Sequence, residues 1–519
     1  MGRKKEVRYL NGRLAGKFLN EETCRKLEMV IQASKDRKRI NNLKNKIFDM
    51  SEEDLKTCLV MKSKDHIMDY APAELSDAQT LGVAFMYYAK RCLIGDSVGV
   101  GKTVEFAGVA NLIKERYGKH YRFLYLTEKT LANEAREKLT RFTGDYVELL
   151  YGEKRFVEEY AGSNTDGVLW DTVGVHSLIN SPTFQSYLLN FEKGNGYFPY
   201  DIVVVDESFI LKNTTTQMWK NCKKMLDKCE FAFMLNATPF ENNLMDFYNQ
   251  IHCLDDTLLP TKTSFSEAYE IKEWNGVFME SSGKYRNEDV FRHQIGYRYF
   301  AQTRKNMGAV MENCEAKVIR VPLSSIQREL MSQVSMPQMV YDYPKYFTFN
   351  NIKEDSPKIG VLLNLIENTL NDEDTILVYT VYKDVQKDIK ESLEWAGISA
   401  EYMNGDTPME VRNNLINGFK NAKFRVLITT VQRGMDFDNC NACVFYSYDP
   451  VPSKMVQFEG RMTRSFDIKN KRVFIITTEG RELNRLRKTI SDRAKAAVSF
   501  AESDFSCVLD LLTDEDWGK

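Results

Sequence analysis

The sequence predicts an α/β protein in which two parallel-sheet domains are joined by an inserted segment. The prediction depends on short apolar runs, on amphipathic segments between them, and on a long gap that divides the runs into two groups. The runs are 92–95, 123–127, 201–207, 231–238, 375–380, 425–430, 442–447 and 472–477. Nearly continuous apolar strands are typical of parallel sheets that helices cover on both faces. Four runs end before residue 240 and four begin after residue 370, so each group is expected to form its own sheet.

Residues 1–66 are predicted to form a basic helical arm, because they lack proline and place apolar residues at helical spacing around Leu27 and Ile31. Residues 1–50 hold 14 Lys/Arg and six Asp/Glu, a balance of +8 in a chain of net charge −2. This excess suits a polyanion or a protein partner. A solvated helical face is the alternative explanation.

The rest of the chain is expected to form four segments. Residues 67–255 and 346–497 are the two α/β domains. The polar and aromatic stretch 256–345 is expected to be a helical insertion between them, and the acidic segment 498–519 is expected to be a tail.

The composition indicates a cytoplasmic protein without membrane spans. No run of 18 apolar residues is present. The ten cysteines are scattered, and the CxxC pair Cys440 and Cys443 has no second pair after it. Reduced thiols are therefore expected in preference to a zinc site.

The segment DSVGVGKT, residues 96–103, is similar to a phosphate-binding loop. It follows the predicted strand 92–95 and precedes a predicted helix, which is the setting that the motif requires. The usual pattern begins with glycine, whereas this segment begins with Asp96.

Within this loop, Gly99 and Gly101 are expected to let backbone N–H groups approach phosphate oxygens, to which the helix N-terminus adds partial positive charge. Lys102 is expected to bind the β- and γ-phosphates of ATP. Thr103 is expected to bind Mg²⁺.

A second motif, DIVVVDES, delivers two carboxylates to the end of a predicted strand. Asp206 is expected to hold the metal, directly or through water, and Glu207 to orient or deprotonate the attacking water. A third motif, QFEGRMTRS, belongs to the second group of strands. Its Arg461 and Arg464 share one face of a helix and are expected to stabilise charge on the transferring phosphoryl group.

Taken in order, these motifs resemble those of superfamily-two helicases and most closely the Swi/Snf-type DNA-dependent ATPases. That family's loop reads D-E-x-G-x-G-K-T, so Asp96 fits the family pattern. The resemblance implies that Gln79 reads the adenine. The segments that carry the resemblance are 75–86, 96–103, 206–213, 236–254, 298–307, 402–419 and 460–464.

The resemblance implies two RecA-like lobes that bind ATP and Mg²⁺ between them and DNA, duplex or forked, across both. We expect the protein to act as a monomer without membrane contact. The implied nucleic-acid contacts are Lys129, Asn133, His176, Ser177, Thr429, Thr430 and Arg433.

The sequence departs from the family pattern at four places, one of which is the absence of the family's R-x-G-Q ending, because Ser465 and Phe466 follow Arg464. Phe209 replaces the usual histidine and Asn236 replaces threonine, which puts the coupling between ATP and nucleic acid in question. QRGMDF, 432–437, is closer to the corresponding segment of other superfamily-two helicases, whose aspartate contacts the ribose. Gly434 and Asp436 would have this role here.

The resulting hypothesis is a translocase on double-stranded DNA, of bacterial or phage type. A helicase that migrates forks or branches in repair or recombination is the first alternative. An ATP-binding clamp with weak or partner-dependent turnover is the second, and an RNA-directed ATPase is the third.

Overall fold

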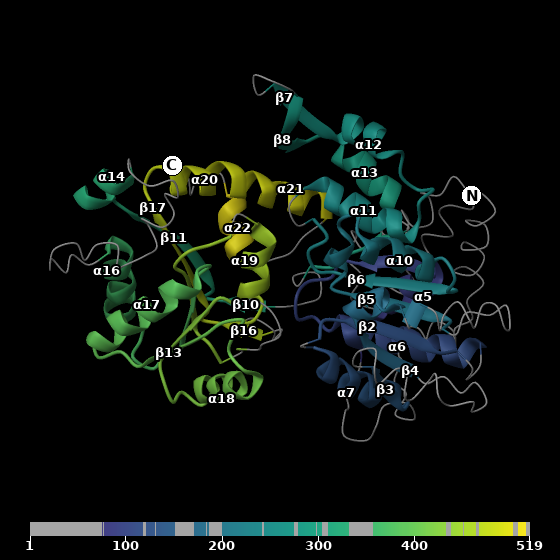
Figure 1. The fold of residues 1–519 in the computed structure, drawn as a ribbon, viewed down its shortest axis with the longest axis horizontal. Coiled ribbons are helices and arrows are strands. Elements are labelled where there is room, and N and C mark those ends of the chain that lie inside the picture. The colour runs from purple at the N-terminus through teal and green to yellow at the C-terminus, as the bar shows by residue number, and fades with distance from the viewer. Residues whose placement is uncertain are drawn as a thin grey trace. The chain divides into compact units, whose positions relative to one another are not determined.

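The computed structural model divides the chain into two α/β units (Figure 1). The first contains Met1–Met307 and Ala497–Asp504, and the second contains Gly308–Ala496 and Phe505–Lys519. The structure describes residues 75, 77–117, 121–129, 131–150, 171–182, 184–185, 200–240, 243–274, 279–296, 298–303, 310–331, 356–431, 437, 439–449, 451–462, 467–501 and 507–514. The expected N-terminal arm, 1–66, lies outside these residues.

The described part of the first unit contains a seven-stranded parallel sheet with the strand order β3-β4-β2-β5-β6-β1-β9. Its strands are β1 (Arg91–Ile94), β2 (Phe123–Thr127), β3 (Val147–Leu150), β4 (Asp171–Val175), β5 (Ile202–Asp206), β6 (Phe231–Leu235) and β9 (Tyr299–Phe300). Strands β2, β4 and β6 are buried along their whole length. Because all pairs are parallel, the carboxyl ends of the strands lie at one edge of the sheet.

Two groups of helices accompany this sheet. Helices α5 (Asp77–Ala89), α6 (Lys102–Tyr117) and α7 (Ala132–Thr143) neighbour one another, and α10 (Gln217–Leu226) neighbours α11 (Leu244–Leu254). Short 3₁₀ segments, η2 (His176–Asn180) and η3 (Ser208–Leu211), follow β4 and β5. Polar side chains cap two of the helices, because Thr216 and Asn243 accept hydrogen bonds from backbone N–H groups in the first turns of α10 and α11.

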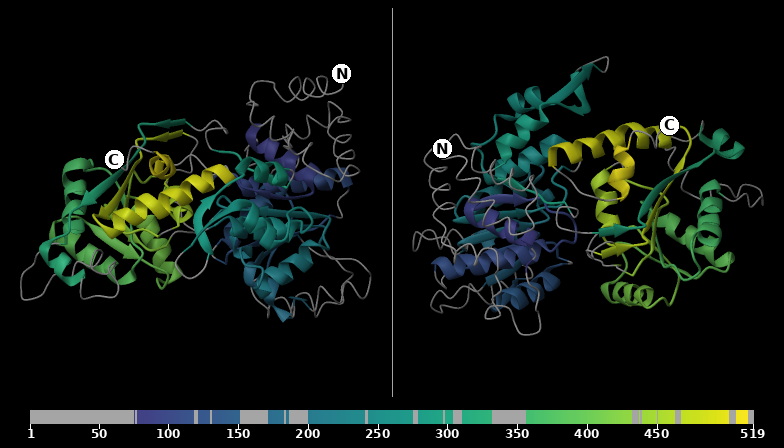
Figure 2. Two further views of the ribbon diagram at one scale, coloured as in Figure 1. Left: turned by 90° about the horizontal axis from the view of Figure 1, so that it is seen from above. Right: turned by 180° about the vertical axis from the view of Figure 1, so that it is seen from behind.

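Within the first unit, an inserted segment follows α11 and rejoins the seven-stranded sheet at β9. It contains α12 (Lys262–Tyr269), β7 (Glu270–Trp274), β8 (Met279–Tyr285) and α13 (Glu288–Ile295). Strands β7 and β8 form an antiparallel hairpin that extends away from the seven-stranded sheet in Figure 1 and in the right-hand view of Figure 2. The expected helical insertion thus contains a hairpin as well as helices.

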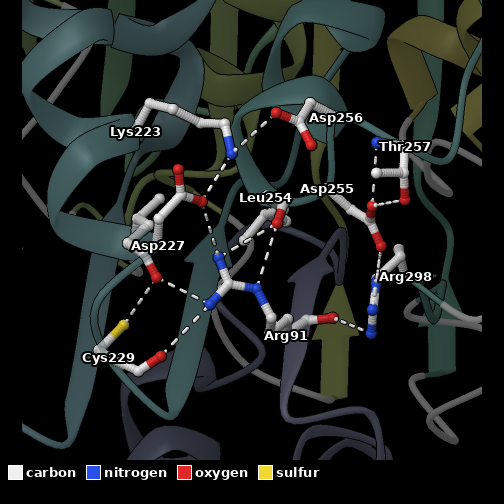
Figure 3. Close-up of polar contacts among 10 residues, drawn as sticks. Arg91, Lys223, Asp227, Cys229, Leu254, Asp255, Asp256, Thr257 and Arg298 are labelled. Carbon is white, nitrogen blue, oxygen red and sulfur yellow. Dashed lines mark hydrogen bonds and ion pairs between the residues drawn. The ribbon is translucent and has the colours of Figure 1, made fainter. Parts of the chain in front are cut away.

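A buried ion pair closes the base of this insertion (Figure 3). A guanidinium nitrogen of Arg298 lies 3.0 Å from Asp255 Oδ2, and only 1% of the Arg298 side chain is exposed. Arg298 also donates hydrogen bonds to the carbonyls of Ala89 and Arg91, at 3.0 and 3.2 Å. Asp255 ends α11 and Arg298 directly precedes β9, so the two ends of the insertion are held side by side.

The described part of the second unit contains a six-stranded parallel sheet with the strand order β11-β17-β15-β12-β14-β13. Its strands are β11 (Glu315–Val321), β12 (Ile376–Tyr379), β13 (Ala400–Met403), β14 (Val426–Thr429), β15 (Ala442–Phe445) and β17 (Arg472–Thr478). A separate parallel pair joins β10 (Val310–Glu312) to β16 (Asp467–Lys469). The later helices are α14 (Ser325–Met331), α16 (Pro357–Asn364), α17 (Lys383–Trp395), α18 (Met409–Lys420), α19 (Pro452–Glu459), α20 (Arg481–Arg485), α21 (Ser491–Ala501) and α22 (Cys507–Thr513).

Alternate residues of the second sheet enter two separate hydrophobic clusters. Leu377 and Leu427 belong to one cluster, whereas the adjacent Ile376 and Val426 belong to the other. Side chains alternate between the two faces of a strand, so both faces of this sheet are buried. This explains why its strands are apolar at nearly every position.

Helix α22 packs into the core of the second unit. Val508 and Leu512 are fully buried in the cluster that contains Phe458 of α19. Glu459 Oε2 accepts a hydrogen bond from the backbone N–H of Val508 at 3.1 Å. The segment expected as an acidic tail, 498–519, therefore contains a packed helix.

The two sheets, parallel throughout and accompanied by helices, confirm the predicted α/β class with two RecA-like lobes. Among the described residues, no helix has the length and apolar character needed to span a membrane.

Candidate nucleotide site

The phosphate loop connects β1 to α6 at the carboxyl edge of the first sheet. Gly99 and Gly101 adopt positive φ angles of 81° and 99°. Such angles strain residues that have a Cβ atom. A Cβ atom on Gly101 would also lie 2.6 Å from Nε2 of Gln79. Both glycines are therefore required by the shape of the loop.

Lys102 begins α6 and reaches back across the loop. Its ammonium donates hydrogen bonds to the carbonyls of Asp96 and Ser97, at 2.8 and 2.9 Å. The ammonium thus lies against the loop whose helix N-terminus provides backbone N–H groups for an anion.

Asp96 is buried and anchors the loop to the segment after β9. Its Oδ1 accepts a hydrogen bond from the backbone N–H of Gln302 at 2.7 Å. The backbone N–H and the hydroxyl of Ser97 both donate to the Gln302 carbonyl, at 3.2 and 3.1 Å. Gln302 lies in the segment 298–307, which carries part of the family resemblance, but sequence reasoning did not single it out as a partner of the loop.

Glu105 lies fully buried in the first turn of α6, close to Asp96. Burial and the negative charge of Asp96 raise the pKa of Glu105, and Lys102 opposes this shift. The protonated form of Glu105 is therefore favoured in the folded state.

Asp206 and Glu207 end strand β5 as predicted. Asp206 Oδ2 accepts hydrogen bonds from the hydroxyls of Tyr125, at 2.8 Å, and Thr127, at 3.4 Å. Its Oδ1 accepts from the backbone N–H of Glu207 at 3.0 Å. Burial and the charge of Glu207 raise the pKa of Asp206 to about 6, although Tyr125 and Lys102 oppose this shift.

Glu207 occupies the left-handed backbone region, with a φ of 50°. This conformation is uncommon for a residue other than glycine and is concentrated at functional sites. Within the described residues, its Oε2 is buried and has no hydrogen-bond partner. The carboxylate is thus available to a group that enters the site.

Tyr125 is a site residue that the sequence motifs do not include. It lies in the middle of β2, and its hydroxyl is 2.8 Å from Asp206 Oδ2 and 3.4 Å from Thr103 Oγ1. Burial and the charge of Asp206 raise the pKa of Tyr125, so its hydroxyl keeps the proton that it donates.

These residues fit a magnesium nucleotide. Hydroxyl and carboxylate oxygens are the ligands that Mg²⁺ prefers, and Thr103 and Asp206 supply them on either side of the Tyr125 hydroxyl. Lys102 is close enough to Asp206 to lower its pKa.

A second network joins β6 to the segment after Glu207. The Asn236 amide donates to Gln250 Oε1 at 2.8 Å, and the Ser208 hydroxyl donates to the same oxygen at 2.9 Å. Asn236 Oδ1 accepts from the backbone N–H of Thr238 at 3.0 Å. Gln250 of α11 therefore links Asn236, which departs from the family pattern, to Ser208 of η3.

His176 makes a further connection to the acidic motif. Its Nε2 lies 2.7 Å from the carbonyl oxygen of Asp206. His176 itself is buried, and the adjacent Ser177 is exposed. Of these two candidate contacts with nucleic acid, His176 is thus buried against the acidic motif, whereas Ser177 faces solvent.

The other predicted residues have varied positions. Gln79 donates a hydrogen bond to the Val100 carbonyl at 2.9 Å and thus contacts the loop. Lys129 and Asn133 are exposed, Thr430 is partly buried, and Thr429 is buried.

Arg461 is buried in the second unit, where its carbonyl accepts from Phe437 N–H at 2.9 Å. The residues that lie outside the described part are Arg433, Gly434, Asp436 and Arg464.

The CxxC pair packs as two buried free thiols. The Cys440 thiol contacts the carbonyls of Thr375 and Ala442, at 3.4 and 3.1 Å. Burial raises the pKa of both Cys440 and Cys443. No group of three or more His, Cys, Asp or Glu side chains among the described residues has the arrangement of a metal site.

Comparison with protein families adds to this geometry. Residues 78–371, more than half of the chain, match the SNF2-related domain. The chain belongs to the SNF2-related family. Residues 357–466 match the helicase conserved C-terminal domain, so this SNF2-related protein carries both parts of an ATP-dependent helicase core.

Several curated proteins are similar to the SNF2-related chain. It is 22% identical over 415 residues to the uncharacterized ATP-dependent helicase YqhH of Bacillus subtilis. This match covers 72% of this chain and 70% of YqhH. It is 20% identical over 558 residues to the Zorya protein ZorD of Escherichia coli, covering 96% of this chain and 50% of ZorD. It is 20% identical over 419 residues to the mouse chromodomain-helicase-DNA-binding protein 1-like, covering 75% of this chain and 45% of that protein.

Among solved structures, the Sulfolobus solfataricus SWI2/SNF2 ATPase core in complex with dsDNA is similar. The match has a TM-score of 0.39 and 14% identity, and it covers 83% of this chain and 98% of that chain.

Proposed function

We propose that this protein is an ATP-dependent translocase on double-stranded DNA that couples hydrolysis to movement and remodels DNA–protein complexes. The observation that carries the proposal is the convergence of Lys102, Asp206 and Glu207 at the carboxyl edge of one parallel sheet. Membership of the SNF2-related family supports ATP as the nucleotide. The name of the mouse relative, a helicase–DNA-binding protein, supports DNA as the partner.

The first unit supplies the groups for phosphoryl transfer to water. Lys102 would bind the β- and γ-phosphates, and Thr103 and Asp206 would hold Mg²⁺. Bound Mg²⁺ would neutralise negative charge on the phosphates. Glu207, with its free carboxylate oxygen, orients the attacking water and accepts its proton. Gln79, next to the loop, recognises the adenine.

The second unit supplies groups that act when the lobes close around the nucleotide. Arg461 and Arg464 stabilise charge on the transferring phosphoryl group, as an arginine finger does. Gly434 and Asp436 contact the ribose.

DNA contacts are expected on side chains outside the nucleotide site. Lys129, Asn133 and Ser177 are exposed in the first unit. Thr430 and Arg433 are the corresponding candidates in the second. Because these groups suit phosphates more than base edges, binding should tolerate any sequence and should weaken with salt.

The test is ATP turnover by the full chain with no nucleic acid, single strands, duplex DNA, forked DNA or RNA. Duplex DNA should stimulate turnover without strand separation. Lys102→Ala should lower the stimulated rate by about 100-fold or more, because it removes a charge from the phosphate site. Glu207→Gln should bind ATP and fail to hydrolyse it. A Lys102→Ala variant with the wild-type rate would overturn the site assignment.

The same experiment separates the alternatives. Preference for forked DNA together with strand separation would indicate a branch-migrating helicase. Stimulation by RNA alone would indicate an RNA-directed ATPase. Tight ATP binding without turnover on every substrate would indicate a clamp.

A further inference from the structure

Tyr125 lies between the two side chains that are proposed to hold Mg²⁺. Its hydroxyl donates to Asp206 Oδ2 at 2.8 Å and lies 3.4 Å from Thr103 Oγ1. Thr103 comes from the first turn of α6, and Asp206 comes from the end of β5. The hydroxyl therefore joins two separate elements at one point of the site.

The ring of Tyr125 is fixed by packing, which fixes the position of the hydroxyl. Tyr125 is completely buried, and its ring centroid lies 5.4 Å from that of Phe106 in α6. Strand β2 pairs with β5, with Tyr125 opposite Val204. The ring thus fills the space between the sheet and α6, and the hydroxyl reaches the first turn of this helix.

The bond from Tyr125 is the shortest that holds the Asp206 carboxylate. The Thr127 hydroxyl lies further away, at 3.4 Å from Oδ2, and the backbone N–H of Glu207 contacts Oδ1 at 3.0 Å. Removing the Tyr125 hydroxyl would therefore leave Oδ2 with one long contact among the described residues.

We propose that Tyr125 is a positioning residue for the magnesium nucleotide, whose hydroxyl orients the Asp206 carboxylate and the Thr103 hydroxyl toward one metal position. This inference rests on the proposed function of the same site. It assigns to β2 a role that none of the sequence motifs contains. The hydroxyl acts through Asp206 and Thr103 and does not touch the reacting atoms.

An ordinary buried tyrosine provides the matched control. Buried tyrosine hydroxyls usually find a partner, whether or not the partner has a function. Tyr200 is also buried, and its hydroxyl donates to Thr172 Oγ1 at 3.3 Å. Tyr200→Phe therefore removes a buried hydroxyl that contacts Thr172 of β4 in the same sheet, without changing Thr103 or Asp206.

The test compares Tyr125→Phe with Tyr200→Phe in the full chain. The measurement is the affinity for a fluorescent, non-hydrolysable ATP analogue, titrated with Mg²⁺ and repeated in EDTA. Tyr125→Phe should weaken binding by about three- to tenfold at millimolar Mg²⁺, which corresponds to the typical net contribution of one hydrogen bond. It should match wild type in EDTA. Tyr200→Phe should match wild type in both conditions.

Thermal unfolding without nucleotide verifies that both variants are folded. If Tyr125→Phe keeps the wild-type Mg²⁺ dependence of binding, or loses affinity equally in EDTA, the positioning role is wrong. If the wild-type protein gains no affinity from Mg²⁺, the proposed ATPase site fails, and the inference fails with it.

Discussion

The Asp96 carboxylate accepts a hydrogen bond from the backbone N–H of Gln302, 206 positions further along the chain. Glycine, the usual residue at this place in the loop, has no acceptor for that N–H group. A buried N–H group without a partner is destabilising. Asp96 therefore has a physical reason to be an aspartate, beyond its agreement with the family pattern.

The neighbouring Glu105 leads to a pH prediction. Burial and the charge of Asp96 raise its pKa above the ordinary value of 4.5, so the folded state retains a proton that the unfolded state releases. The contribution of Glu105 to stability is full below pH 4.5 and declines as the pH rises toward the folded-state pKa. Glu105→Gln, which cannot ionise, should therefore be more stable than wild type near neutral pH.

Denaturant unfolding without nucleotide or Mg²⁺, at several pH values, measures this difference. It should shrink as the pH falls and disappear below pH 4.5. A difference that stays constant with pH would show that Glu105 ionises normally in the fold.

At the scale of elements, α22 makes a quantitative prediction. Val508 of this helix is fully buried, whereas 47% of Val411 in α18 is exposed. Val508→Ala should lower the free energy of unfolding by about 2 kcal/mol, because it leaves a cavity in the core. Val411→Ala should change it by less than about 0.5 kcal/mol. Equal effects in chemical denaturation would mean that α22 contributes nothing to the second unit.

The base of the insertion supplies a second matched pair. Asp255 faces the buried Arg298, whereas Asp256 is 52% exposed and lies 3.5 Å from Lys223. Asp255→Asn should destabilise the protein by about 3 kcal/mol, because it leaves a buried guanidinium without its counter-charge. Asp256→Asn should cost less than about 1 kcal/mol. Thermal unfolding of the two variants tests this, and similar melting temperatures would contradict it.

At the scale of the whole molecule, the sequence predicted the buried strands well. Each of the eight apolar runs forms a strand, namely β1, β2, β5, β6, β12, β14, β15 and β17. Among the strands of the two large sheets, the sequence did not predict β3, β4, β9, β11 or β13. Strand β9 has only two residues, and the ion pair of Arg298 with Asp255 places it beside β1. Such a strand depends on a distant contact and leaves no local pattern.

The candidate site likewise contains residues that a local motif predicts and residues that only distant contacts bring together. The phosphate loop and the pair Asp206–Glu207 are local motifs, so their place at strand ends could be predicted. Tyr125, Gln302 and Gln250 reach the site from β2, the segment after β9, and α11. Tyr125 is a single residue inside an ordinary strand, and the segments that contain Gln302 and Gln250 do not indicate which residues they contact. Only the fold brings the three to their partners.

The closed base of the insertion also has a practical consequence for protein engineering. Because Asp255 and Arg298 hold the entry and exit of this segment side by side, the hairpin and its two helices form a cassette. A short linker between these two residues could span the junction, but it would remove Phe265 and Phe291, whose buried rings pack against Tyr248 and Phe247 of α11. A corresponding cassette from a relative, placed at the same junction, would therefore need matching aromatic residues to cover α11.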